Sequence, residues 1–122
     1  MTLLLAGGGA GCGGGTPTRH PSAVEVRLSC ATGDPDAPCA FRPAHVTIRV
    51  GGTVRWVNDD ATYHTVTSTD RLRPRRPNGD FGAVLDAAGE TFQRRFSEPG
   101  RYPYYCQPHA EFMVGTVTVV RR

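Results

Sequence analysis

Three side chains that can bind a soft metal ion lie close together near the end of the sequence. They are Cys106, His109 and Met113, within the segment YYCQPHAEFMVG. A second imidazole, that of His64, stands much earlier in the chain, after an Asn-Asp-Asp turn. Two imidazoles, one thiolate and one weak thioether are the donor set of a blue-copper electron-transfer site. The residue types therefore predict a single copper ion held by these four side chains.

The chemistry of copper explains why such a mixed donor set is useful. Cu(I) favours soft donors and few ligands, whereas Cu(II) favours nitrogen and a tetragonal arrangement. A trigonal plane of two nitrogens and one sulfur, with a distant thioether, is acceptable to both states, so the ion moves little when its charge changes. The protein must hold that plane rigid. We therefore expect the loop of Cys106 to be fixed at both ends by strands and stiffened by Pro108, whose ring restricts the backbone.

Each of these residues also has an ordinary structural interpretation. His64 could be a half-buried core histidine, and Cys106 could be a small buried hydrophobe. Met113 could simply fill space beside Phe112. The Cys106–His109 pair could also be a nucleophile with its base, but the sequence offers no clear oxyanion hole and no cleft-forming insertion. The copper interpretation depends on all four residues together.

Short alternating segments predict the elements that would position the ligands. Apolar side chains recur at every second residue, and Gly, Pro, Asn and Asp separate the segments, which is typical of β-strands. We expect strands at residues 23–28, 45–50, 53–57, 64–68, 91–96, 99–106 and 114–120. No stretch has a convincing helical period, so an all-β sandwich or barrel is predicted. The segment 70–80, DRLRPRRPNGD, is expected to be a loop whose arginines are solvated, although they could steer an acidic partner.

Taken together, these segments resemble the cupredoxin family of small blue (type 1) copper proteins, which includes plastocyanin, pseudoazurin and amicyanin. The segment FRPAHVTIRVGGTVRWVNDDATYHTVTS is similar to the family's first half, where a Trp-x-Asn turn precedes the first ligand histidine. The segment GETFQRRFSEPGRYPYYCQPHAEFMVGTVTV is similar to its second half. The resemblance implies a Greek-key β-sandwich of about eight strands. It also implies that Met113 is the axial copper ligand and that the equatorial ligands are His64, Cys106 and His109.

Two positions depart from the family pattern. Three residues separate His109 from Met113, whereas plastocyanin-like loops usually have four there and amicyanin-like loops have two. This spacing leaves a longer or tilted axial contact as an alternative for Met113. Thr65 stands where plastocyanin has asparagine after its first ligand, and its hydroxyl could help to pin the ligand loop.

The N-terminal residues have the composition of an export signal. The stretch MTLLLAGGGAGCGGG contains a short apolar run that cannot cross a bilayer, followed by small residues. We predict a disordered, Gly-rich, signal- or lipoprotein-like leader at 1–12, a flexible tether at 13–22 and the copper-binding domain at 23–122. The AGC motif resembles a lipoprotein cleavage site, in which Cys12 would be lipidated. The alternative is a leader with an unmodified cysteine.

Two further cysteines, Cys30 and Cys39, are placed for a disulfide bond. They flank ATGDPDAP, a turn-rich stretch that can bring its two ends together. In an exported protein we expect them to be oxidised, and the bond would contribute roughly 2–3 kcal/mol of stability in the chain-entropy model. Two free thiols in a reducing compartment are the alternative. A zinc pair is not expected, because no second ligand pair follows.

The sequence thus predicts a one-electron carrier that cycles between Cu(I) and Cu(II) and has no catalytic turnover of its own. In the family that it resembles, the second loop histidine is exposed among apolar residues. Redox partner proteins are therefore expected to dock transiently around His109. The predicted location is the periplasm or the outer face of the cell membrane, with Cys12 as a membrane tether, and the predicted state is a monomer.

Other classes of function are less compatible with the sequence. A copper-handling role, as chaperone, scavenger or sensor, uses the same site and is the main alternative, and a metal-free interaction module is another. Nucleic acid binding is not expected, because the formal net charge is only +3 and no basic stripe alternates with aromatic residues. Four histidines in 122 residues cannot supply the additional sites of a multicopper oxidase or nitrite reductase.

Overall fold

The structure is a computed structural model that describes residues 20–121. The predicted leader with Cys12, and most of the predicted tether, lie outside the described residues. The first strand begins at Ala23. Within the described part of the chain, no helix is long and apolar enough to cross a membrane.

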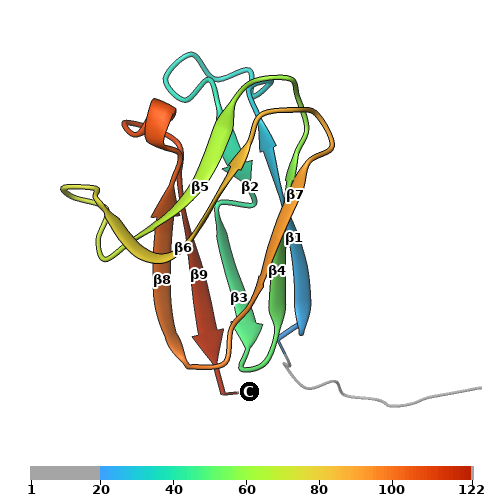
Figure 1. Cartoon of the computed structure of the whole chain (residues 1–122), viewed down its shortest axis with the longest axis vertical. Coiled ribbons are helices and arrows are strands. Elements are labelled where there is room, and N and C mark those ends of the chain that lie inside the picture. Colours follow the sequence, from blue (N-terminus) through green and yellow to red (C-terminus); the bar gives the residue numbers. More distant parts are fainter. Residues whose placement is uncertain (1–19, 122) are drawn as a thin grey trace, which may run out of the picture.

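The described residues form nine β-strands in two sheets that pack face to face (Figure 1). The strands are β1 (Ala23–Ser29), β2 (Ala40–Arg42), β3 (His45–Arg49), β4 (Thr53–Asn58), β5 (His64–Thr69), β6 (Pro77–Leu85), β7 (Thr91–Arg95), β8 (Gly100–Tyr105) and β9 (Val114–Val120). One sheet has the order β2-β1-β4-β7, and the other has the order β3-β9-β8-β5-β6. The pairs β1–β4 and β3–β9 are parallel. The prediction of an all-β sandwich is confirmed, with nine strands in place of about eight.

Two of these strands are absent from the sequence-based prediction. β2 has only three residues, too few to show an alternating pattern. β6 begins at Pro77, inside the segment expected to be a loop, so that prediction is wrong for residues 77–80. Proline can begin a strand because no donor is needed at that position. The irregular start of β6 is tied to β5 by Ser68, whose hydroxyl donates to the Phe81 carbonyl and accepts from the Phe81 N–H, both at 2.8 Å.

Aromatic side chains between the sheets support the strands that lead into the ligand loop. Tyr104, two residues before Cys106, is fully buried and makes edge contacts with Phe41 and Trp56 at ring-centroid distances of 4.7 and 5.4 Å. Gly115, on the other side of the loop, lies against the Tyr104 ring, and a Cβ added there would overlap that ring. Only glycine allows β9 to pass so close to this aromatic core.

Candidate metal centre

The predicted ligands lie at one end of the sandwich, on two segments that are distant in sequence (Figure 1). Three of the four lie on the loop between β8 and β9, which contains a short 3₁₀ turn at Gln107–His109, and His64 is the first residue of β5. β5 and β8 are antiparallel and pair through Thr67 and Tyr105. This register places the start of β5 beside the end of β8, where the ligand loop begins.

Backbone hydrogen bonds close the ligand loop on itself. The Cys106 N–H donates to the Met113 carbonyl at 3.0 Å, and the Met113 N–H donates to the His109 carbonyl at 2.9 Å. The His109 N–H donates in turn to the Cys106 carbonyl at 3.1 Å. Pro108 lies inside this turn and has no N–H to satisfy. The three candidate ligands of the loop are therefore linked through their own backbone, which limits how far their side chains can separate.

Thr65 joins this loop to the strand of His64. The Gln107 N–H donates to Thr65 Oγ1 at 2.9 Å, and the Thr65 N–H lies 3.4 Å from the Cys106 sulfur. Thr65 is itself buried. The sequence suggested that the Thr65 hydroxyl could pin the ligand loop, and in the structure it does so by accepting the Gln107 N–H.

Asn58 shapes the turn before His64. Its buried side-chain amide donates to the carbonyl oxygens of Thr62 and Leu85 at 3.1 and 2.9 Å, and its side-chain oxygen accepts from the Asp60 N–H at 3.1 Å. Both amide hydrogens and the amide oxygen are therefore used. These bonds are the physical reason for the Trp-x-Asn turn that the sequence indicates, and they hold His64 at the start of its strand.

Both histidines direct a ring nitrogen toward the same sulfur. The Nδ1 atoms of His64 and His109 are 3.8 and 3.4 Å from Cys106 Sγ, and one donor atom from each of the three residues lies within 4.8 Å of the others. Imidazole and thiolate donors bind a zinc ion at roughly 2.0–2.3 Å, and a trigonal angle then places two such donors about 3.7 Å apart. The observed separations therefore fit a single ion of similar size between the three donors.

Met113, the predicted fourth ligand, lies inside the core. Its side chain is fully buried in the same hydrophobic cluster as Cys106. A thioether is a weak, soft ligand, and together with two imidazoles and one thiolate it selects copper over hard cations. The chemistry of the donors thus agrees with their spacing.

Burial sets the charge of these groups in the absence of an ion. It raises the pKa of the Cys106 thiol, although the N–H groups of Thr65 and His109 act in the opposite direction. Burial also lowers the pKa of His64, against the opposing effect of the Asp60 carboxylate. A neutral thiol and a neutral imidazole are therefore favoured, and a bound cation is what would stabilise the thiolate.

The two histidines differ in exposure. The side chains of His64, Cys106 and Met113 are completely buried, whereas His109 is partly exposed. Its ring lies 5.7 Å from the ring of Phe112, centroid to centroid, and the exposed Pro108 precedes it in the chain. Of the four candidate ligands, only His109 reaches the surface.

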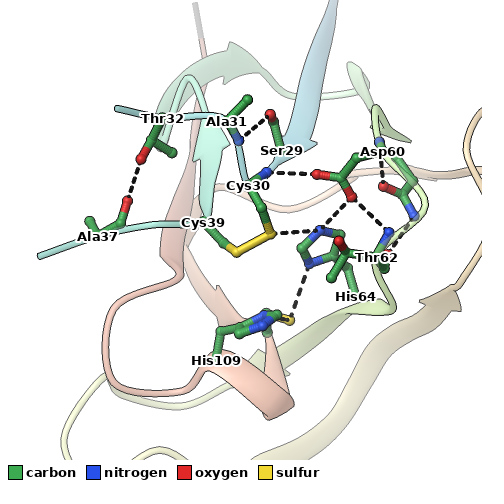
Figure 2. The surroundings of a disulfide bond; sticks show 12 residues. Ser29, Cys30, Ala31, Thr32, Ala37, Cys39, Asp60, Thr62, His64 and His109 are labelled. Carbon is green, nitrogen blue, oxygen red and sulfur yellow. Dashed lines mark hydrogen bonds and ion pairs between the residues drawn. A yellow bond between two sulfur atoms is a disulfide. The ribbon is translucent and has the colours of Figure 1, made fainter. Parts of the chain in front are cut away.

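The other face of His64 is covered by a carboxylate and a disulfide (Figure 2). His64 Nε2 lies 3.3 Å from Asp60 Oδ1 and 3.7 Å from the sulfur of Cys30, which is bonded to Cys39 with an S–S distance of 2.02 Å. Cys30, Asp60 and His64 thus form a second group of potential donor atoms. Because the Cys30 sulfur is oxidised, this group offers no thiolate and is not a second site for a soft metal.

Sequence reasoning used Asp60 only as a turn residue. In the structure, burial acts to raise its pKa, but hydrogen bonds from the N–H groups of Cys30 and Thr62 and the contact with His64 outweigh that effect and lower the pKa below its usual range. The position of Asp60 four residues before a candidate ligand was the available signal, but it could not show which atoms the carboxylate would face.

Fold and donor cluster together define a small copper-binding β-sandwich protein. Residues 28–120 match the family described as copper binding proteins, plastocyanin/azurin family. The chain belongs to this family, which confirms the resemblance drawn from the sequence and the expectation of a copper cofactor.

Named relatives agree with this membership. Plastocyanin from Scenedesmus fuscus is 34% identical over 100 residues, which span 79% of this chain and 98% of the relative. Plastocyanin from Nostoc punctiforme is 32% identical over 114 residues, which span 85% of this chain and 78% of the relative.

Solved structures show the same fold. A purple cupredoxin from Nitrosopumilus maritimus has a TM-score of 0.67 at 32% identity, covering 79% of this chain and 98% of that chain. A copper-containing nitrite reductase from Thermus scotoductus has a TM-score of 0.59 at 25% identity, but the match covers only 25% of that enzyme. The fold therefore also occurs as one part of a larger copper enzyme.

Proposed function

We propose that the protein is a one-electron carrier with a type 1 copper site formed by His64, Cys106, His109 and Met113. The observation that carries this proposal is the convergence of two imidazole Nδ1 atoms on one buried sulfur, from segments that are hydrogen-bonded to each other. When bound, copper supplies the Cu(II)/Cu(I) couple. The chain supplies a donor cage whose spacing is set by backbone bonds and core packing. A cage of this kind is suited to fast electron transfer, because little has to rearrange.

Electrons would enter and leave at the exposed edge of His109, because the other candidate ligands are buried. We propose that redox partners dock there transiently on a monomeric carrier, against the apolar loop neighbours Pro108, Ala110 and Phe112, which are partly or fully exposed. Apolar contacts without charge pairs favour rapid dissociation, which a shuttle requires.

The partner's surface is proposed to be acidic. The segment between β5 and β6 contains Arg71, Arg73, Arg75 and Arg76, none of which forms an ion pair within the described part of the chain. Pro77, which follows directly, shares a surface hollow with Gln107 of the ligand loop. We propose that the unpaired positive charge of this arginine loop accelerates encounter with an anionic partner that docks at His109.

A small anionic oxidant, hexacyanoferrate(III), can test this steering. In an Arg73→Glu/Arg76→Glu variant, the rate of oxidation of the reduced protein should fall severalfold at low salt, and the difference should vanish at high salt. An Arg95→Glu/Arg121→Glu variant makes the same change of charge elsewhere on the surface and should have a smaller effect. Equal effects of the two variants would show that only net charge matters.

Export is also part of the proposal. The apolar, Gly-rich N-terminal segment supports it, and so does the disulfide, since such bonds persist mainly in oxidising compartments. We propose a location in the periplasm or on the outer face of the membrane, with Cys12 lipidated. Mass spectrometry of the mature protein should find an N-terminal Cys12 carrying acyl chains, whereas an unmodified N-terminus beyond that residue would remove the anchor from the proposal.

The central test is addition of Cu(II) to the purified full chain, followed by visible and EPR spectroscopy. We expect an intense visible band from thiolate-to-copper charge transfer, and its loss in Cys106→Ala. His45→Ala is the matched control, because His45 is exposed at the start of β3 and outside the cluster. A colourless, redox-inert copper complex would refute the carrier function. A coloured protein that exchanges electrons slowly but readily gives up Cu(I) to an acceptor would instead indicate copper handling.

A further inference from the structure

The His64 side chain is completely buried, and its two ring nitrogens have different surroundings. Nδ1 faces the Cys106 sulfur at 3.8 Å, whereas Nε2 faces Asp60 Oδ1 at 3.3 Å. A neutral imidazole carries one proton, and the nitrogen that binds a metal must be the unprotonated one. If Nδ1 is the metal-binding atom, the proton resides on Nε2 and needs an acceptor, because no water reaches a side chain with 0% exposure.

Asp60 is held in place to accept that proton. The Cys30 N–H donates to Asp60 Oδ2 at 2.7 Å, and the Thr62 N–H donates to Asp60 Oδ1 at 3.0 Å (Figure 2). The parallel pairing of β1 with β4 matches Leu28 to Asn58, which brings Cys30 alongside Asp60. With two backbone donors already engaged, the carboxylate cannot turn away from the imidazole without breaking them.

The disulfide closes this arrangement from outside. The Cys30 sulfur lies 3.7 Å from His64 Nε2, so the disulfide covers this edge of the buried imidazole, while 28% of the Asp60 side chain remains exposed. An ion pair or charge-assisted hydrogen bond is stronger in such a place than at the surface, since water screens it less.

We propose that Asp60 is a positioning residue of the metal centre, which holds His64 as the Nε2–H tautomer and places a negative charge behind the ligand. Carboxylate–histidine–metal pairing orients the imidazole and raises its basicity. A more basic, anion-backed ligand stabilises Cu(II) more than Cu(I), so Asp60 lowers the reduction potential of the site. The second statement depends on the proposed electron-carrier function, whereas the first concerns the metal-free protein alone.

The tautomer is tested without any metal. A long-range ¹H–¹⁵N spectrum of the metal-free full chain should show His64 protonated at Nε2 and unprotonated at Nδ1. Asp60→Asn should retain this tautomer, because an amide oxygen in the place of Oδ1 can accept from both the Thr62 N–H and Nε2–H, while only the bond from the Cys30 N–H is lost. Asp60→Ala should lose the tautomer, because no acceptor then faces Nε2. An Nδ1–H tautomer in the unmodified protein would overturn the proposal, even if both variants failed to fold and even if the copper function were wrong.

The charge is tested by the potential of the copper-loaded protein. Asp60→Asn should shift the Cu(II)/Cu(I) equilibrium at least tenfold toward Cu(I), which is about 59 mV for one electron. Asp59→Asn is the matched control, because it removes the same charge one residue away, from an exposed carboxylate that pairs with Arg27. A shift below twofold is expected there. Equal shifts in the two variants would show that Asp60 acts only as a distant charge and has no special relation to His64.

Discussion

The buried amide of Asn58 allows a quantitative test of what holds the first ligand in place. Asn58→Ala removes three hydrogen bonds, to Thr62, Leu85 and Asp60. Each such bond contributes about 1 kcal/mol net, and a buried carbonyl that loses its donor costs about 1–3 kcal/mol. Leu85 is nearly completely buried, whereas Thr62 is exposed and its carbonyl can be rehydrated. We therefore expect a loss of about 3 kcal/mol in the free energy of unfolding.

The assay is urea unfolding of the metal-free protein, followed by tryptophan fluorescence, and the chain provides a close control. The side chain of Asn78 likewise donates to the Asp70 carboxylate, accepts from the Asp80 N–H and lies against the Ser68 hydroxyl, but it is exposed. Asn78→Ala should cost less than about 1 kcal/mol, because water can replace the lost partners. If the two variants were equally destabilised, burial would not be the source of the effect and the reasoning would fail.

Three further outcomes are expected. Gly115→Ala should destabilise the protein by about 1–3 kcal/mol by overpacking against Tyr104, as measured by urea unfolding, and a change below about 0.5 kcal/mol would mean that β9 can move aside. Replacing Cys30 and Cys39 by serine should cost about 2–3 kcal/mol by the same measurement, and full retention of stability would contradict a constraining role for the bond. The metal-free protein should lose stability as pH falls below about 6.5, because the folded-state pKa of His64 is lowered and the unfolded chain then binds the additional proton. This dependence, at most about 1.4 kcal/mol per pH unit, should weaken in His64→Gln, and an unchanged slope would assign it to other groups.

The strand pattern was largely predictable, because half-buried strands have a sequence period of two. Residues 53–57 and 114–120 alternate apolar and polar side chains, and both appear as strands at nearly those positions. β6 escaped prediction because its first residues are exposed and show no alternation, and because the irregular pairing with β5 is bridged by bonds of the Ser68 side chain to Phe81. Such bonds depend on a partner segment that no local pattern reveals.

The residues of the candidate site also differ in how far the sequence could predict them. Cys106, His109 and Met113 could be recognised because their spacing along one loop is itself a signal. The contact between Asp60 and His64 could be anticipated from no pattern, although the two residues are close in sequence. It depends on the β1–β4 register, which brings the backbone of Cys30 within hydrogen-bond distance of the carboxylate. A local sequence pattern can therefore identify a ligand residue, but the groups that contact that residue are set by the tertiary structure.

The parallel pairing of β3 with β9 has a kinetic consequence for the copper site. It joins His45 to Thr116, and contacts between such remote parts of a chain form slowly, because closing a long loop costs entropy before any contact stabilises it. The loop of Cys106 joins the adjacent strands β8 and β9 and can close locally, but the full sheet that brings His64 to it also needs the remote pairings of β5 with β8 and of β3 with β9, so the complete cage should mature late in folding. A metal ion present during refolding would then encounter the Cys106 thiol before the other ligands are in place. The yield of correctly loaded protein should therefore depend on whether the metal is added before or after refolding.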